Sequence, residues 1–78
     1  MRKRIVTYDV FGDDYDDFYD FLNQNPHKKL TESTYEISSN LDWEDFCRTI
    51  YDMFHVGDTV YIISTDTESK LLIKKIRG

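Results

Sequence analysis

Cysteine, proline and glycine are scarce in this chain, which has one cysteine, one proline and three glycines in 78 residues. A single cysteine, Cys47, cannot form a disulfide within the chain, so nothing in the sequence points to secretion. No stretch approaches the roughly 18 apolar residues that a membrane-spanning helix needs, and no signal-peptide pattern is present. The sequence therefore predicts a cytoplasmic protein that does not enter a membrane.

Basic residues are missing from one part of the chain. Residues 9–20 contain six aspartates and no lysine or arginine, and the net charge of the whole chain is −5. Seven of the ten cations lie near the two ends, in residues 2–4 and 70–77. The overall charge disfavours a freestanding nucleic-acid binder. A basic edge would exist only if the two ends of the chain lay side by side.

What the chain does contain predicts one folded domain over residues 1–78. Hydrophobic residues make up 40% of the chain and aromatic residues 15%, so disorder is not expected. Strands are predicted at residues 4–10, 28–38, 59–65 and 71–76, and the strand at 28–38 is either one long strand or two short ones with a bend near Tyr35. Helices are predicted from Asp13 or Asp14 to Asn25 and from 41 to 54, the second one capped by Ser39 or Asn40.

Both predicted helices are amphipathic. The first should bury Tyr15, Phe18, Tyr19 and Leu22. Its opposite face holds four aspartates, which solvation alone explains: Asp13, Asp16, Asp17 and Asp20. The inward face of the second helix comprises Trp43, Phe46, Cys47, Ile50, Met53 and Phe54.

The order of these elements is strand, helix, strand, helix, strand, strand. It predicts an α+β, ferredoxin-like sandwich with two helices on one face of a mainly antiparallel sheet of four to five strands. The last strand exceeds the minimal form of that fold. Such a strand commonly pairs with an open sheet edge, which can belong to another subunit.

Four stretches of the chain, in this order, resemble those of two related families. They are Tyr8-Asp9-Val10, Asp13-Asp14, Ser33-Thr34-Tyr35-Glu36 and the strand from Asp58 to Ile62. The families are the small CRISPR-associated adaptation protein, often described as an endoribonuclease, and the virulence-associated protein D toxins, which are ribonucleases. The similarity spans roughly residues 4–65.

This resemblance implies a homodimer whose two sheets face each other and whose C-terminal strands add to the neighbouring sheet. It implies that Asp9 lies close to its symmetry mate, so that the two carboxylates hold Mg²⁺ or Mn²⁺, cations that prefer oxygen ligands. It places Ser33 and Tyr35 near that site as further catalytic residues. The alternative for Asp9 is a strand-end aspartate that caps the turn through Gly12.

The chain departs from this family pattern along the first helix. The adaptation proteins usually carry arginine and lysine there, where they meet the nucleic-acid backbone, whereas this chain has Asp16, Asp17 and Asp20. Carboxylates on that face repel phosphate. Two hypotheses therefore stand: a metal-dependent endonuclease acting on RNA or DNA, and a non-catalytic dimeric scaffold whose acidic helix binds a basic protein partner of a defence or toxin–antitoxin system.

Overall fold

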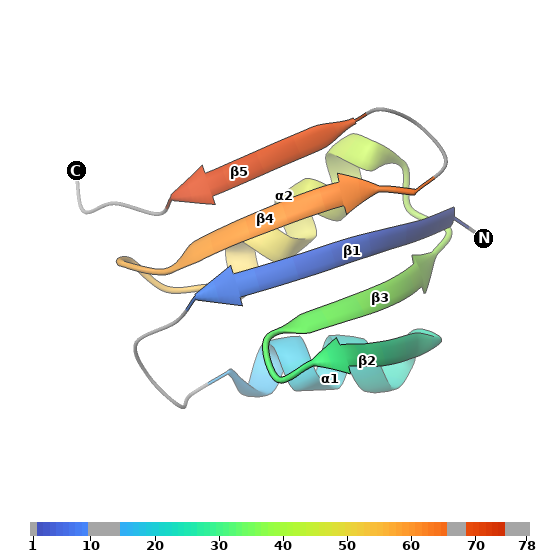
Figure 1. The fold of residues 1–78 in the computed structure, drawn as a ribbon, viewed down its shortest axis with the longest axis horizontal. Helices are drawn as coiled ribbons and strands as arrows, with labels where there is room; N and C mark the ends of the chain where they lie inside the picture. Colours follow the sequence, from blue (N-terminus) through green and yellow to red (C-terminus); the bar gives the residue numbers. More distant parts are fainter. Residues whose placement is uncertain (1, 10–14, 66–68, 75–78) are drawn as a thin grey trace.

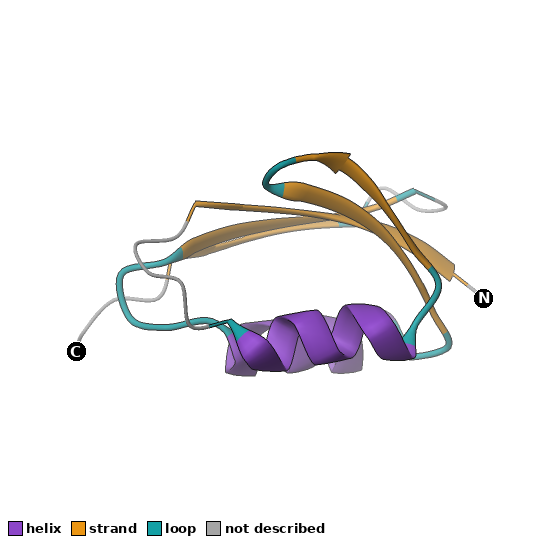
Figure 2. Ribbon diagram, turned by 90° about the horizontal axis from the view of Figure 1, so that it is seen from below, coloured by secondary structure: helices purple, strands orange, loops and turns teal. Residues whose placement is uncertain are grey.

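Five strands and two helices form two layers, a sheet with both helices on one of its faces (Figures 1 and 2). The computed structural model describes residues 2–9, 15–65 and 69–74. Their elements are β1 (Arg2–Asp9), α1 (Asp16–Gln24), β2 (His27–Thr31), β3 (Thr34–Ser39), α2 (Trp43–Met53), β4 (Thr59–Ser64) and β5 (Lys70–Lys74). The predicted α+β class with two helices on one face of the sheet is confirmed.

The sheet has the strand order β2-β3-β1-β4-β5, and all neighbouring strands run antiparallel. β1 is therefore the central strand, between β3 and β4. In Figure 1, α1 lies behind β2 and β3, and α2 lies behind β4. Neither described helix is long and apolar enough to cross a membrane.

The core lies between the sheet and the helices. Burial alternates strictly along β3 and β4, so every second residue of these strands faces the helices. The completely or almost completely buried apolar side chains come from all three central strands and both helices, and they include Val6, Phe18, Ile37, Phe46, Ile50, Val60 and Ile62. Their burial removes apolar surface from water, which is the dominant favourable term in folding.

A charged residue, Arg4, is buried within this core and is only 1% exposed. Its Nη1 donates a hydrogen bond of 2.7 Å to the carbonyl oxygen of Leu41, and its guanidinium carbon lies 4.9 Å from the centroid of the Phe46 ring. Arg4 therefore cannot belong to a basic edge formed by the two ends of the chain. β4 also separates β1 from β5, so the two terminal strands are not neighbours.

The segment predicted as a strand at residues 28–38 is a hairpin of two short strands. The chain turns at Glu32 and Ser33 rather than near Tyr35. The hydroxyl of Thr31 accepts a hydrogen bond from the Ser33 amide, a local contact that favours a turn over a continuous strand. Tyr35 instead lies within β3, where its ring packs into the core.

The start of each helix differs from the sequence prediction. The residue before α1 is Tyr15, which makes no side-chain capping bond, and the predicted caps Asp13 and Asp14 lie outside the described residues. The cap of α2 is Asp42, not Ser39 or Asn40, because its Oδ1 accepts a 2.8 Å hydrogen bond from the Asp45 amide. That bond satisfies an amide of the first turn, so α2 begins at Trp43.

The buried face of α1 is narrower than predicted. Tyr15, Phe18 and Leu22 are buried, but Tyr19 is 48% exposed. Positions 15, 18 and 22 fall on one stripe of a helix, whereas Tyr19 follows Phe18 by about 100° and lies at the margin of that stripe. Asp16, Asp17 and Asp20 are exposed, as expected. The predicted inward face of α2 is confirmed, with Trp43 and Met53 partly buried against the core.

The last strand pairs within its own chain. β5 runs antiparallel to β4, with Leu72 opposite Tyr61 and Ile73 opposite Val60. It forms one edge of the sheet, and β2 forms the other. The predicted end of this strand, at residue 76, lies outside the described residues.

Gly57 is the position where the backbone most directly requires glycine. Its φ is 97°, and no other described residue has a positive φ. We expect Gly57→Ala to lower the free energy of unfolding by about 1–2 kcal/mol, because a Cβ clashes in the left-handed region. Chemical denaturation measures this. Val56→Ala at the exposed neighbour should change the value by less than about 0.5 kcal/mol, and equal effects of both substitutions would contradict the account.

Candidate functional site

Asp9 ends the central strand on the face of the sheet that the helices do not cover. In β1, Arg4 and Val6 are buried and Tyr8 packs on Phe18 and Phe54 of the helix layer. Side chains alternate along a strand, so Asp9 points to the opposite face. It is exposed, and no described residue forms a hydrogen bond or ion pair with its carboxylate. No described element covers this face of the sheet in Figure 2.

Ser33 lies at the same end of the sheet as Asp9. It is in the turn between β2 and β3, and its carbonyl oxygen accepts a 3.0 Å hydrogen bond from the amide of Tyr8. This hydrogen bond attaches Ser33 to the residue that precedes Asp9. The structure brings these two predicted site residues to one end of the sheet, where β1 finishes and β4 begins opposite it, with Asp9 paired to Thr59.

Tyr35, the third predicted site residue, lies on the other face of the sheet. It pairs with Val6 in the register of β1 and β3, and both side chains are buried against the helices. The Tyr35 ring stacks on Tyr8 with a centroid distance of 6.4 Å and meets Phe18 edge-on at 5.8 Å. Tyr35 is therefore separated from Asp9 by the sheet itself. It contacts the end of β1 through Tyr8.

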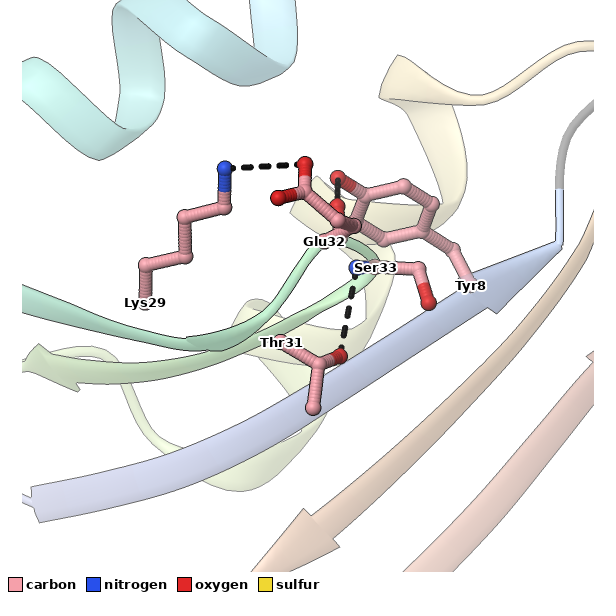
Figure 3. A network of polar contacts seen from close by, with 5 residues as sticks. All are labelled: Tyr8, Lys29, Thr31, Glu32 and Ser33. Carbon is pink, nitrogen blue, oxygen red and sulfur yellow. Dashed lines mark hydrogen bonds and ion pairs between the residues drawn. The ribbon is translucent and has the colours of Figure 1, made fainter.

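The hydroxyl of Tyr8 contacts the turn between β2 and β3. It donates a 3.4 Å hydrogen bond to the carbonyl oxygen of Glu32 (Figure 3). Burial, followed by the nearby Tyr35, Tyr19 and Glu32, raises the pKa of Tyr8 to about 12. On the same turn, Lys29 forms a 3.1 Å ion pair with Glu32, which raises the pKa of this lysine. This pair is exposed, so its contribution to stability is small.

No group of three or more histidine, cysteine or acidic side chains that could hold a metal ion exists within the described ranges. Among the described residues of one chain, Asp9 offers a single carboxylate at this site. Proteins usually bind Mg²⁺ through one or two carboxylates, and waters and substrate phosphates complete its octahedron. Two Asp9 side chains from two copies would supply the two carboxylates of such a site. The described residues of one chain contain no group of three ligands that could enclose the ion.

One buried polar cluster at this end of the molecule was not predicted. Asp58 is 2% exposed, and its carboxylate oxygens accept hydrogen bonds of 2.9 and 2.8 Å from the hydroxyl of Tyr15. The amide of His55 donates to the same carboxylate at 2.8 Å. The sequence signals only a Gly-Asp turn here, because the partner Tyr15 lies 43 residues away along the chain.

The structure also places the cysteine and the two histidines of the chain. Cys47 is buried on α2, and burial raises the pKa of its thiol, so it behaves as a small apolar side chain and not as a nucleophile. His27 and His55 are exposed and lie in different parts of the fold.

Comparison of the chain with known protein families, curated proteins and solved structures finds no match.

The raised pKa of Tyr8 predicts a pH dependence of stability. A tyrosine ionises near pH 10 in the unfolded chain and Tyr8 at about 12 in the folded one, so its contribution is complete below pH 10 and is lost as the pH rises to about 12. The free energy of unfolding should therefore fall less steeply over this interval in Tyr8→Phe than in the wild type. Denaturation at a series of pH values measures this, with the exposed Tyr51→Phe as the control. Identical slopes for Tyr8→Phe and wild type would refute the prediction.

Proposed function

We propose that this chain is the subunit of a homodimeric, metal-dependent endoribonuclease of the CRISPR-associated or toxin-like kind. The observation that carries the proposal is the position of Asp9, an exposed carboxylate at the end of the central strand on the open face of the sheet. A carboxylate there can meet its counterpart from a second copy. The resemblance of the stretches around Asp9, Ser33 and Asp58 to those families supports the same function.

The proposed fold assignment is ferredoxin-like. The strand order β2-β3-β1-β4 is antiparallel, and a helix follows both β1 and β3. These features support a split β-α-β arrangement with the fifth strand added at the β4 edge.

The proposed dimer joins the two open faces. Two rows of paired residues cross the middle of this face. Thr34, Thr7, Tyr61 and Leu72 belong to the first row, and Lys28, Glu36, Ile5, Ile63 and Lys70 belong to the second row. The second row has isoleucines at its centre and lysines at both ends. An apolar centre with a charged rim is typical of protein interfaces, and two sheets packed face to face lie about 10 Å apart. With a two-fold axis parallel to β1, such packing would bring the ends of the two β1 strands towards each other.

In this dimer the two Asp9 carboxylates would hold Mg²⁺ or Mn²⁺. The bound cation would stabilise the charge that develops on the phosphate oxygens. The hydroxyl of Ser33, in the turn tied to Tyr8, would contact the phosphate of the substrate. Tyr35 would act by holding Tyr8, and so the end of β1, in place.

The charge distribution favours one direction of approach for nucleic acid. The exposed Asp16, Asp17 and Asp20 repel phosphate from α1, whereas the exposed Lys28 and Lys70 lie at the rim of the open face. The proposed substrate is RNA, with DNA as the alternative. The proposed location is the cytoplasm, in agreement with the single buried Cys47.

A second function has its own supporting observation. The two helices carry six acidic residues and one cation, Arg48; the acidic residues are Asp16, Asp17, Asp20, Glu44, Asp45 and Asp52. Within the described ranges, the observed ion pair is that of Lys29 with Glu32, so no described lysine or arginine forms a direct ion pair with these helix carboxylates. A hollow of about 220 Å³ between the start of α1 and the end of α2 is lined by Asp16, Asp17 and three other residues. This surface would suit a basic protein partner of a non-catalytic dimeric scaffold.

Cleavage assays test the first function. Purified protein is incubated with labelled RNA or duplex DNA in Mg²⁺, Mn²⁺ or EDTA. Asp9→Asn should slow cleavage about 100-fold or more, because it removes one charged oxygen ligand from each subunit. EDTA should abolish cleavage. The matched control is Asp16→Asn, which removes an exposed carboxylate from α1 and should leave cleavage unchanged.

Two outcomes would count against the nuclease. Cleavage that survives in Asp9→Asn would assign the activity to another site or to a contaminant. No cleavage by the wild type with any metal would favour the scaffold, provided that the wild type binds polylysine and a triple substitution of Asp16, Asp17 and Asp20 by asparagine weakens this binding.

A further inference from the structure

Asp58 is a buried carboxylate that the proposed chemistry does not use. It is 2% exposed, and its Tyr15 partner is 6% exposed. A carboxylate removed from water is costly unless donors surround it. The Tyr15 hydroxyl and the His55 amide supply such donors at 2.8–2.9 Å, distances typical of charge-assisted hydrogen bonds. Asp58 therefore fixes both donors in space.

The turn that carries Asp58 is itself constrained. The amide of Asp58 donates a 3.0 Å hydrogen bond to the carbonyl oxygen of His55, and Gly57 supplies the positive φ of 97° between them. His55 and Asp58 thus hold each other through two hydrogen bonds, one from each amide. The Asp58 carboxylate is a rigid anchor, and the hydroxyl of Tyr15 binds to it.

This anchor is next to the candidate site. Asp58 directly precedes Thr59, which pairs with Asp9 in the register of β1 and β4. Tyr15 directly precedes α1, the helix that follows β1. The connection from β1 to α1 starts after Asp9, which pairs with Thr59. The first described residue after this connection is Tyr15, whose hydroxyl is hydrogen-bonded to Asp58. Two neighbouring residues, Asp58 and Thr59, therefore hold the residues on either side of the connection.

We infer that Asp58, through its hydrogen bond to Tyr15, is a positioning residue for the Asp9 carboxylate. It sets where the chain re-enters the fold after Asp9, and so it limits the movement of the end of β1. This inference rests on the proposed function for the role of Asp9 in cleavage. The restraint on the end of β1 stands on the hydrogen bonds alone.

The substitution Tyr15→Phe tests the inference because it removes one oxygen atom and keeps the ring that packs on Phe54 and His55. Amide hydrogen exchange is measured at residues 9 and 59, the last pair of β1 and β4, and at Ile62 in the middle of β4. Exchange at 9 and 59 should accelerate about tenfold or more relative to Ile62, as loss of a charge-assisted bond predicts. Cleavage should show a kcat about tenfold lower and an unchanged KM.

The matched control is Tyr19→Phe, which removes an exposed hydroxyl from the same helix and should alter none of these quantities. Equal acceleration at residues 9, 59 and 62 would mean a purely global loss of stability, and no acceleration would mean no restraint; either result overturns the inference. If the wild type does not cleave RNA, the proposed function fails and the exchange ratio still decides the positioning role. Should Tyr15→Phe fail to fold, Asp58→Asn, which keeps the shape and one acceptor oxygen, takes its place with the same expected ratio.

Discussion

The alternation of side chains along β1 is the constraint on which the rest of the structure depends. β1 is central in the sheet, and both helices lie on one face. Val6 must therefore point to the helices, because they bury its apolar surface, and Asp9 three residues later must point away. A shift of one residue in register would expose Val6 and Tyr8 and bury a carboxylate. The hydrophobic core thus fixes the orientation of the candidate site.

Buried polar groups join the helix layer to the sheet at opposite ends of the fold. Near the start of β1, Arg4 bonds to the carbonyl of Leu41, just before α2. At the start of β4, Asp58 bonds to Tyr15, just before α1. Each contact gives a buried charged side chain a hydrogen-bond partner in the segment that leads into a helix. Apolar packing supplies most of the stability in such a core, whereas these directional bonds hold the segments that lead into the two helices against the sheet layer.

Patterns of local periodicity predicted the inward face of α2 and the order of the elements apart from the β2–β3 hairpin, because amphipathic spacing depends only on neighbouring residues. The predicted bend near Tyr35 and the predicted cap of α2 at Ser39 or Asn40 were wrong. The observed turn at Ser33 and cap at Asp42 each depend on which of several adjacent polar side chains bonds the backbone. The pair of Tyr15 and Asp58 could not be predicted, because it joins residues distant in sequence. The resemblance predicted Asp9, Ser33 and Tyr35 as site residues. The fold brings Asp9 and Ser33 to one end of the sheet but places the Tyr35 side chain on the other face.

Thiol cross-linking tests most directly whether Asp9 faces its counterpart across the open faces of two sheets. Asp9→Cys is made in a Cys47→Ala background and treated with a short bismaleimide cross-linker, because two packed sheets lie about 10 Å apart and a direct disulfide requires Cα atoms within about 7 Å. The matched control is Asp20→Cys, on the exposed side of α1. We expect a covalent dimer from Asp9→Cys and none from Asp20→Cys at the same concentration. A chain that stays monomeric in Asp9→Cys, or dimers that form equally well through position 20, would contradict a site shared by two copies.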